Sequence, residues 1–454
     1  MKSYLLFFCL LPFVGFGFPL AGQTRPWTLR ECIRHAMENN IDLRQKRLEQ
    51  EARAIEVNTA AHSRLPSLNA GLGQNFDFGR SPSKDGVIVD RNSANSSAYL
   101  QVSVPLFDGF RMSNTLAARR LDLLAAAESA QAAGEDLSVG VASYFLQALY
   151  CKELVGIAEL QAALSAEQIT RTEALVEAGK APLSQLYDVK AQRAGDEVRC
   201  VEARNNAALA LLNLAQLLEV DPGGEEGFEV FAPPLADPRQ EETLAEPSLV
   251  YLNAVARKPR IREQEWLLES RKKMLRVARA GYFPQLSLSL NYSNGYYRYF
   301  GADDIVHVGF ADQLRQNERK TIGFSLSIPI FNRWEVRNSV RSARVAIHSQ
   351  ALAVESAKKS LYKEIRQAYF NAVASREKFL AATQSSEAAR EAFTYAGERY
   401  ATGRSTVFEY NESKTKYAQS LSEQAQAKYD FIFRSKILDF YNGTPITLSG
   451  SAEE

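Results

Sequence analysis

The sequence predicts a mixed architecture, in which a membrane β-barrel sheet continues into a long α-helical coiled-coil tunnel and the whole unit is duplicated along the chain. Three observations predict it: a secretory signal at the N-terminus, four segments that alternate apolar and small polar residues, and helical stretches of unusual length. A globular sandwich or a fibrous coiled coil would explain one of these observations alone. The combination is typical of an exported protein that crosses a membrane as strands and extends away from it as helices.

The segment 1–22 has the composition of a signal peptide. A lysine precedes an apolar run from Leu5 to Phe18, and the small residues Ala21 and Gly22 follow. The run is too short, and too often broken by proline and glycine, to cross a membrane as a helix. We therefore predict cleavage near Ala21 or Gly22 and export of the mature chain.

Four segments alternate with a period of two and are predicted as strands, at residues 66–78, 98–107, 284–294 and 321–331. The last is the clearest, because one set of alternating positions is apolar and the other holds small polar residues: Ile322, Phe324, Leu326, Ile328 and Ile330 against Thr321, Gly323, Ser325 and Ser327. Successive side chains of a strand point to opposite faces, so each segment has one apolar face and one polar face. Long polar loops, at about 79–97 and 295–320, join the strands of each pair.

Very long helices follow the strand pairs. No proline or glycine occurs from Asn332 to Ala396, and the segment is rich in residues that favour helix. At 1.5 Å per residue it forms a rod of roughly 100 Å. Apolar residues spaced three and four apart indicate that the rod packs as a coiled coil. We predict long helices at 110–178 and 332–400, and return helices, which follow glycine-bearing turns, at 183–219 and 405–441.

The chain is internally duplicated. A proline opens one strand in each half, a Pro-apolar-Phe triplet closes another, and a Tyr-Phe pair and a Gly-Lys or Gly-Arg turn recur at nearly the same offset. Each repeat reads helix, strand, strand, very long helix, turn and return helix. We divide the chain into a signal peptide, a first repeat, a proline-rich linker, a second repeat and a C-terminal tail, at residues 1–22, 23–219, 220–247, 248–441 and 442–454.

Strands of this length match a tilted bilayer crossing in a barrel. The apolar face would meet lipid and the polar face would line water, with aromatic residues at both ends as an interfacial belt. Four strands cannot close a barrel, and an open sheet edge in hydrocarbon leaves backbone groups unpaired at a cost of several kcal/mol each. Further copies of the chain must therefore complete the barrel.

Several features together resemble TolC-like outer-membrane efflux proteins: the order of elements, the paired Gly-Lys and Gly-Arg turns, and the opening Trp27-Thr28-Leu29-Arg30-Glu31-Cys32-Ile33. The resemblance covers essentially the whole mature chain. It implies a homotrimer with a 12-stranded barrel in the lipid of the outer membrane and a helical tunnel in the periplasm. It also implies a passive exit duct for drugs, toxic small molecules or polypeptides, in a tripartite efflux pump or a type I secretion system. A periplasmic adaptor (membrane fusion protein) and an inner-membrane transporter would be its partners.

The resemblance also places a periplasmic gate at the helical tip. Glu409 and Glu412 are three residues apart and share one face of the second return helix; the matching acidic residues of the family ring the mouth of the tunnel. Tyr400 and Arg404 resemble the closing contacts of the family. The alternative for the glutamates is a solvated helix face near an N-terminus, where acidic residues are favoured in any case.

The first repeat departs from this pattern. It has Gln185 where an acidic residue is expected, with Asp188 about a turn later. The two turns of the tip are expected to dock on the adaptor, although they also read simply as good helix C-caps. The residues of this docking tip are Gly179, Lys180, Gly403 and Arg404.

Catalysis is not indicated. The four histidines, His35, His62, His307 and His348, are dispersed and show no metal-ligand spacing, so we expect no metal, no cofactor and no enzymatic activity. The net charge of +1, with 24% charged residues, gives no sign of a nucleic-acid partner. The three cysteines of the mature chain lie far apart in the sequence and are expected to be buried as small apolar residues.

Two other functions compete with the duct. A periplasmic adaptor is also exported and rich in coiled coil. The strands of an adaptor would be buried on both faces, whereas each of the predicted strands has one polar face. An outer-membrane barrel enzyme would need a histidine on the polar strand faces, and none of the four lies there. The sequence does not indicate which cargo is exported, because a tube lined by small polar groups has little chemical preference.

Overall fold

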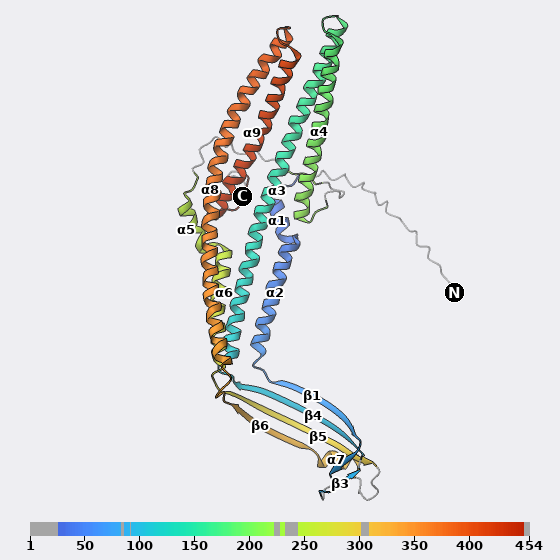
Figure 1. Ribbon diagram of the computed structural model, residues 1–454, viewed down its shortest axis with the longest axis vertical. Coiled ribbons are helices and arrows are strands. Elements are labelled where there is room, and N and C mark those ends of the chain that lie inside the picture. Colours follow the sequence, from blue (N-terminus) through green and yellow to red (C-terminus); the bar gives the residue numbers. More distant parts are fainter. Residues whose placement is uncertain are drawn as a thin grey trace, which may run out of the picture.

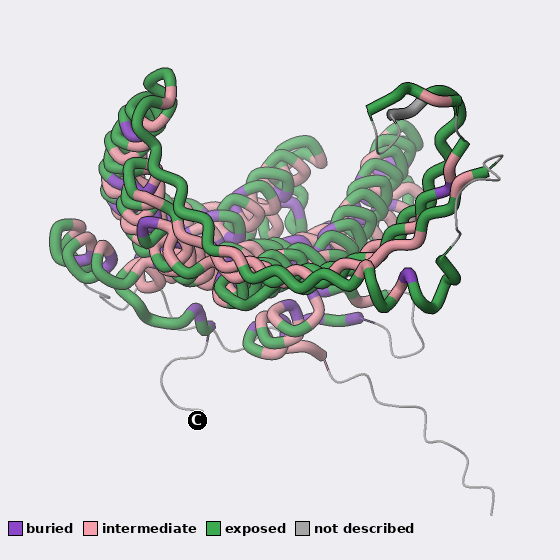
Figure 2. Tube along the Cα trace, turned by 90° about the horizontal axis from the view of Figure 1, so that it is seen from below, coloured by how far each residue is buried: buried purple, intermediate pink, exposed green. Residues whose placement is uncertain are grey.

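The structure, a computed structural model, describes residues 26–82, 86–90, 92–221, 228–231, 244–300 and 308–448. The predicted signal peptide lies outside these residues. The described chain is a long bundle of helices that ends in a four-stranded sheet set at an angle to it (Figure 1). Seen from the sheet end, helices and sheet curve together as one open arch (Figure 2). The predicted fold class, strands for a barrel joined to a helical tunnel, is therefore confirmed.

The two halves of the chain contain matching elements. The first half holds α1 (Leu29–Asn39), α2 (Ile41–His62), β1 (Ser67–Asp77), β4 (Asn92–Phe107), α3 (Arg111–Glu177) and α4 (Leu183–Leu218). The second half holds α5 (Pro247–Arg257), α6 (Pro259–Ala280), β5 (Gln285–Phe300), β6 (Arg319–Ser327), α8 (Glu335–Ala401) and α9 (Val407–Asn442). The long helices α3 and α8 have 67 residues each, and the return helices α4 and α9 have 36 each, as a duplication requires.

Three strand boundaries differ from the prediction by four residues or more. β4 begins at Asn92 rather than at 98, and β5 continues to Phe300 rather than ending at 294, because these polar and aromatic extensions pair with each other. β6 ends at Ser327 rather than at 331, two residues before Pro329, which has no backbone N–H to donate. The expected polar loops also contain short elements: the hairpin of β2 (Arg80–Pro82) and β3 (Ile88–Asp90), and helix α7 (Phe310–Gln316).

The strand register separates the two faces of the sheet. The strands are antiparallel in the order β1-β4-β5-β6. One row across the sheet is entirely apolar: Leu68, Val102, Leu290 and Ile322. The neighbouring row holds only small residues: Ser67, Ser103, Ser289 and Gly323. The apolar face is open in this chain, since Leu68 is 64% exposed and Ile322 is 71% exposed.

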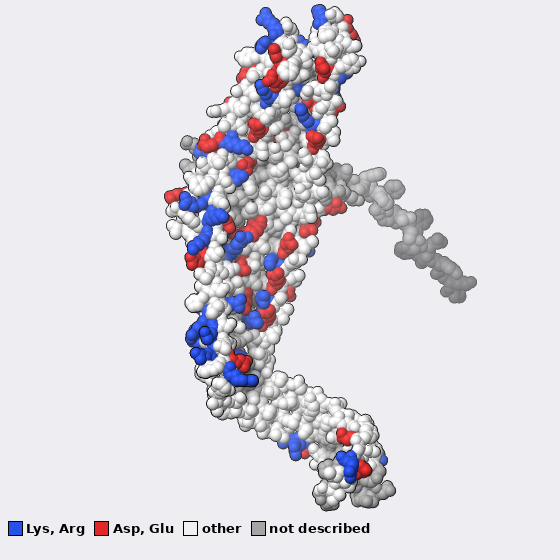
Figure 3. All heavy atoms as spheres, in the orientation of Figure 1, with Lys and Arg blue, Asp and Glu red and all other residues white. Residues whose placement is uncertain are grey.

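Charged side chains are scarce on the sheet. In Figure 3 they are dense along the helices, almost absent over the part of the sheet that adjoins the bundle, and present again at its far end. A band without charges is the pattern of a bilayer-facing surface. In the part of the chain that the structure describes, no helix combines the length and the apolarity that a membrane crossing needs.

The junction between sheet and bundle has the same backbone conformation in both repeats. Phe110 and Trp334 each precede a long helix in the left-handed region, with φ of 63° and 64°. This conformation is uncommon for residues other than glycine. Each ring packs edge-on against an aromatic residue at the end of the preceding strand segment, Phe107 or Phe331. The duplicated turn redirects the chain from the sheet into the bundle.

The largest apolar core lies midway along the bundle, around α3. Phe145, Leu149 and Leu214 are buried there, together with the free thiols Cys32 and Cys151. Cys200 is buried as well. The predicted heptad stripe of α8 faces its neighbours, and its buried members include Val340, Val354, Leu361, Ile365, Ala372 and Phe379.

Two segments that we expected to be irregular contribute to this core. In the predicted linker 220–247, Phe228 and Val230 are buried, and Val230 forms a parallel bridge with Trp27. In the predicted tail 442–454, Ile446 and Leu448 are buried against the same core. Both segments therefore fasten the middle of the bundle, and residues 222–227, 232–243 and 449–454 lie outside the described part.

Candidate functional site at the helical tip

Two helical hairpins form the end of the bundle far from the sheet. The first hairpin is α3 with α4, and the second hairpin is α8 with α9; their turns stand apart at the top of Figure 1. Both turns have glycine in the left-handed region, Gly179 at φ 68° and Gly403 at φ 74°. In both, the following residue donates its backbone N–H to a carbonyl five residues earlier, Lys180 to Leu175 and Arg404 to Arg399, at 2.8 Å each. The turns are thus glycine C-caps of one type.

The acidic pair lies at the start of α9. Glu409 accepts hydrogen bonds through Oε2 from Ser405 Oγ at 2.6 Å and from Arg399 Nη2 at 3.5 Å. Its backbone N–H is capped by Thr406 Oγ1. Glu412 pairs with Lys416 at 2.7 Å. Each carboxylate therefore has a cation of its own hairpin beside it, while both side chains remain 49% exposed.

Tyr400 connects the two hairpins. Its side chain is 8% exposed and its ring stacks on Tyr410, with centroids 5.1 Å apart. The Arg171 guanidinium of α3 lies 5.1 Å from the Tyr400 ring centroid and donates a hydrogen bond to the Ala401 carbonyl at 2.8 Å. Burial, and then the negative charge of Glu167, raise the pKa of Tyr410 above its ordinary value. Within the described chain the Tyr400 hydroxyl is buried without a hydrogen-bond partner.

The structure brings together only some of the predicted gate residues. Tyr400, Arg404 and Glu409 belong to one turn, and the Arg404 carbonyl accepts a bond from Arg399. Gln185 and Asp188 lie on the other hairpin, Gln185 half-buried and Asp188 exposed. The described contact between the hairpins at this height comes from Arg171, which the sequence did not single out. A lone arginine on a helix with many charges carries no pattern that could have indicated it.

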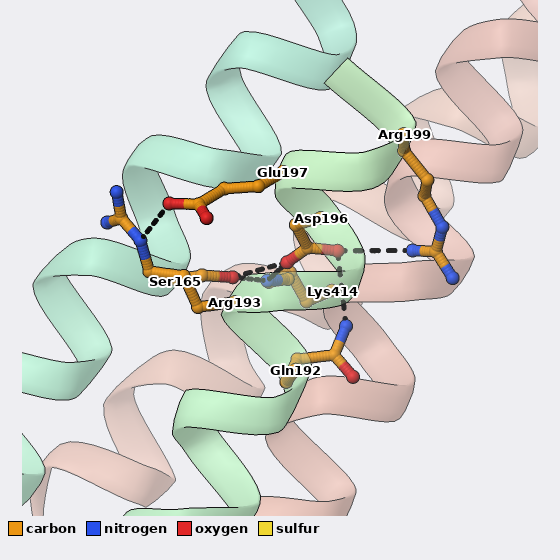
Figure 4. A network of polar contacts seen from close by, with 7 residues as sticks. All are labelled: Ser165, Gln192, Arg193, Asp196, Glu197, Arg199 and Lys414. Carbon is orange, nitrogen blue, oxygen red and sulfur yellow. Dashed lines mark hydrogen bonds and ion pairs between the residues drawn. The ribbon is translucent and has the colours of Figure 1, made fainter. Parts of the chain in front are cut away.

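A buried charged network lies a few turns from the tip (Figure 4). Lys414 of α9 donates through Nζ to Asp196 Oδ2 of α4 at 2.7 Å and to Ser165 Oγ of α3 at 2.5 Å. The Ser165 hydroxyl in turn donates to Asp196 Oδ2. Gln192 and Arg199 donate to the other carboxylate oxygen, at 3.2 and 3.1 Å. The Asp196 carboxylate is thus held by four side chains.

The sequence analysis did not predict this network, because its residues on α3 belong to a polar row. Along α3 a row of polar residues, spaced four, three and four apart, is buried: Gln161, Ser165, Gln168 and Thr172. This spacing is the core spacing of a coiled coil, but polar residues in such a row are usually read as a solvated face. This polar row in heptad register is the pattern from which the buried network could have been predicted.

The comparisons with known proteins identify the family. The family model of the outer membrane efflux proteins matches residues 32–219 and 250–442. The chain is 23% identical to the outer membrane protein TolC of Escherichia coli over 426 residues, which are 92% of this chain and 82% of that protein. It is 29% identical to the pyoverdine export outer membrane protein OpmQ of Pseudomonas aeruginosa over 378 residues, 78% of this chain and 72% of that protein.

A solved structure agrees with the architecture. The Campylobacter jejuni CmeC outer membrane channel superimposes with a TM-score of 0.75 at 17% identity, over 94% of this chain and 87% of that one. Its likeness concerns the fold, which includes both the strands and the long helices. Because the family model covers both repeats, from α1 to the end of α9, the chain belongs to the outer membrane efflux protein family.

Proposed function

We propose that three copies of this chain form an outer-membrane exit duct, a channel-tunnel for efflux or secretion whose sheets close a 12-stranded barrel in the lipid. The observation that carries the proposal is the register of the sheet. An apolar row and a small polar row alternate across all four strands, and among the described residues of the single chain the outer strands β1 and β6 each have an unpaired edge. Backbone groups at such edges must be paired inside a membrane, and neighbouring copies would pair them.

The family match also decides between the functions that the sequence left open. The relatives are outer-membrane proteins, and the matched residues include the strands as well as the helices. A duct in the outer membrane is therefore supported rather than a periplasmic adaptor. Members of this family are channels, so the duct acts as a passage and the energy for export comes from an inner-membrane transporter, joined to it by a periplasmic adaptor.

We place the periplasmic gate at the tip, with Glu409 and Glu412 at the mouth of the tunnel and Tyr400, Arg404, Gln185 and Asp188 around it. The support is that both glutamates are half-exposed at the start of α9, beside the turn. Threefold symmetry would bring six carboxylates to one mouth, where their summed potential attracts cations. Arg399 and Lys416 pair with the two glutamates and lower this potential.

Charge reversal tests the gate. The double variant Glu409→Lys, Glu412→Lys is expected to change the channel in a planar bilayer from cation-preferring to anion-preferring, since every carboxylate becomes an ammonium group. The reversal potential in a salt gradient measures this preference. Glu49→Lys, on α2 in the half of the bundle next to the sheet, is the control and should leave the preference unchanged. An unaltered reversal potential in the double variant would remove these glutamates from the mouth.

We further propose that the two turns, Gly179-Lys180 and Gly403-Arg404, dock on the adaptor. They are exposed and stand at the end of the molecule farthest from the sheet. In whole cells, a cysteine at Lys180 or Arg404 is expected to cross-link to the adaptor, whereas a cysteine at Lys272 on α6 is not. The cross-linked bands, identified by mass spectrometry, decide the question. Adaptor linked to position 272 alone would place docking away from the tip.

A further inference from the structure

In the described part of the chain, polar contacts join the two hairpins at three heights. Nearest the core, Lys428 of α9 lies 3.2 Å from Glu153 of α3. At the tip, Arg171 of α3 contacts the end of α8. Between them is the network of Lys414, Asp196 and Ser165 described above. At 1.5 Å per residue, Ser165 lies roughly 18 Å from the end of α3.

The middle contact differs from the other two in burial. The side chains of Lys414 and Asp196 are 1% and 0% exposed, and Ser165 is fully buried. In the contact nearest the core, the Lys428 and Glu153 side chains are 30% and 36% exposed, and Arg171 at the tip is exposed. Water screens the two outer contacts, so breaking either of them has little effect on free energy. Separating Lys414 from Asp196 would leave a buried ammonium group without water and a buried carboxylate with only the exposed Arg199 as a cation, which is strongly unfavourable.

The wall around the network is weakly packed. The core positions of α3 on both sides of Ser165 are polar, and both amide atoms of Gln168 are buried without a hydrogen-bond partner in the described chain. On the side toward the core, a groove lined by Ala158, Arg199 and Ala418 separates α4 from α9. Apolar packing therefore contributes little to holding the two hairpins together at this height. The network of Lys414, Asp196 and Ser165 is the contact that holds them.

We propose that Lys414, Asp196 and Ser165 form a pivot, which stays closed while the tip of the second hairpin moves away from the first. This inference rests on the proposed gate and adds a positioning residue to it. Lys414 lies two residues after Glu412 on α9, so it anchors α9 to the first hairpin just behind the stretch that carries both glutamates. Opening then breaks the exposed Arg171 contact and leaves the buried one intact.

Distances between spin labels in the assembled, full-length protein test the pivot. One labelled pair, Lys180→Cys with Arg404→Cys, reports on the tip. The other, Glu197→Cys with Lys416→Cys, reports on the level of the network from two exposed neighbours of the pivot residues. Cys200 is replaced by alanine. Cys32 and Cys151 are buried, and burial raises the pKa of both thiols, to about 12 for Cys32, so we expect both to react only slowly with the label.

The tip contact is then released by Arg171→Ala. The pivot predicts that the distance across the tip lengthens and broadens while the distance at the network level stays the same. Lengthening of both distances together would overturn the proposal, because the network would then open with the tip. An unchanged tip distance would overturn it as well. Neither result bears on the ion preference of the glutamates, so a failure of the pivot is distinguishable from a failure of the gate.

Channel conductance gives a second measurement. Lys414→Met is expected to raise the resting conductance of assembled trimers severalfold, because α9 loses its anchorage. The exchanged pair, Lys414→Asp with Asp196→Lys, is expected to return the conductance toward the original value. A role in stability alone would lower the melting temperature of Lys414→Met without changing its resting conductance, and that result would contradict a positioning role.

Discussion

Replacing Lys414 with methionine is expected to lower the free energy of unfolding of the helical bundle by about 3–5 kcal/mol. The substitution removes the ammonium group and leaves the fully buried Asp196 carboxylate with a single ion-pair partner, Arg199, whose own side chain is 60% exposed. Ser165 loses its hydrogen-bond donor in the same step. Unfolding by heat or denaturant, followed by the helical circular dichroism signal, measures the loss.

Two further variants show whether burial is the cause. Lys416→Met, two residues away, breaks the exposed pair with Glu412 and is expected to change stability by only about 0.5 kcal/mol. The triple variant Ser165→Ala, Asp196→Leu, Lys414→Met replaces the whole network by apolar groups and should recover most of the lost stability, since no buried charge remains. Equal losses for Lys414→Met and Lys416→Met would show that the network is not a buried charged core.

An arginine at Phe324 is expected to cost about 2–4 kcal/mol in the stability of the membrane-inserted protein. Phe324 is 71% exposed in the single chain and shares the apolar face of β6 with Ile322 and Leu326. If that face meets lipid, the guanidinium is placed in hydrocarbon. Folding of the purified protein into lipid vesicles at increasing denaturant concentration gives the difference in free energy.

The neighbouring residue provides the matched control. Ser325 points to the opposite face of the same strand, which would line water, so Ser325→Arg should cost much less than Phe324→Arg. The two variants have the same charge, the same strand and almost the same depth. A larger cost at Ser325 than at Phe324 would mean that the polar face meets the lipid and that the sheet is inverted relative to our proposal.

Most of the fold could be predicted from the sequence, because its signals are local. The alternation from Ile322 to Ser327 depends only on the geometry of one strand, and the long helices follow from composition and from the absence of proline and glycine. The errors occurred where pairing decided the outcome. β4 and β5 extend beyond their alternating segments because Asn92 finds a partner in Phe300, and no local pattern indicates such a partner.

Less of the candidate site than of the fold could be predicted from the sequence. The glycine turns could be located because a left-handed residue at a helix end favours glycine. The placement of Glu409 and Glu412 at the mouth came from the family resemblance and remains a prediction that charge reversal can test. Arg171 acts through a ring and a carbonyl of another hairpin, and such contacts depend on how the hairpins pack.

By itself the sequence determined the elements of this protein: an amphipathic strand or a helical rod is specified by side chains that lie close together along the chain. Only the tertiary structure decided which polar groups are hidden. Asp196 and Lys414 are 218 residues apart and read as ordinary solvated charges, yet they meet in the interior of the tunnel wall. Burial is a property of the packed helices, and it turns a common surface pair into the contact that is hardest to break.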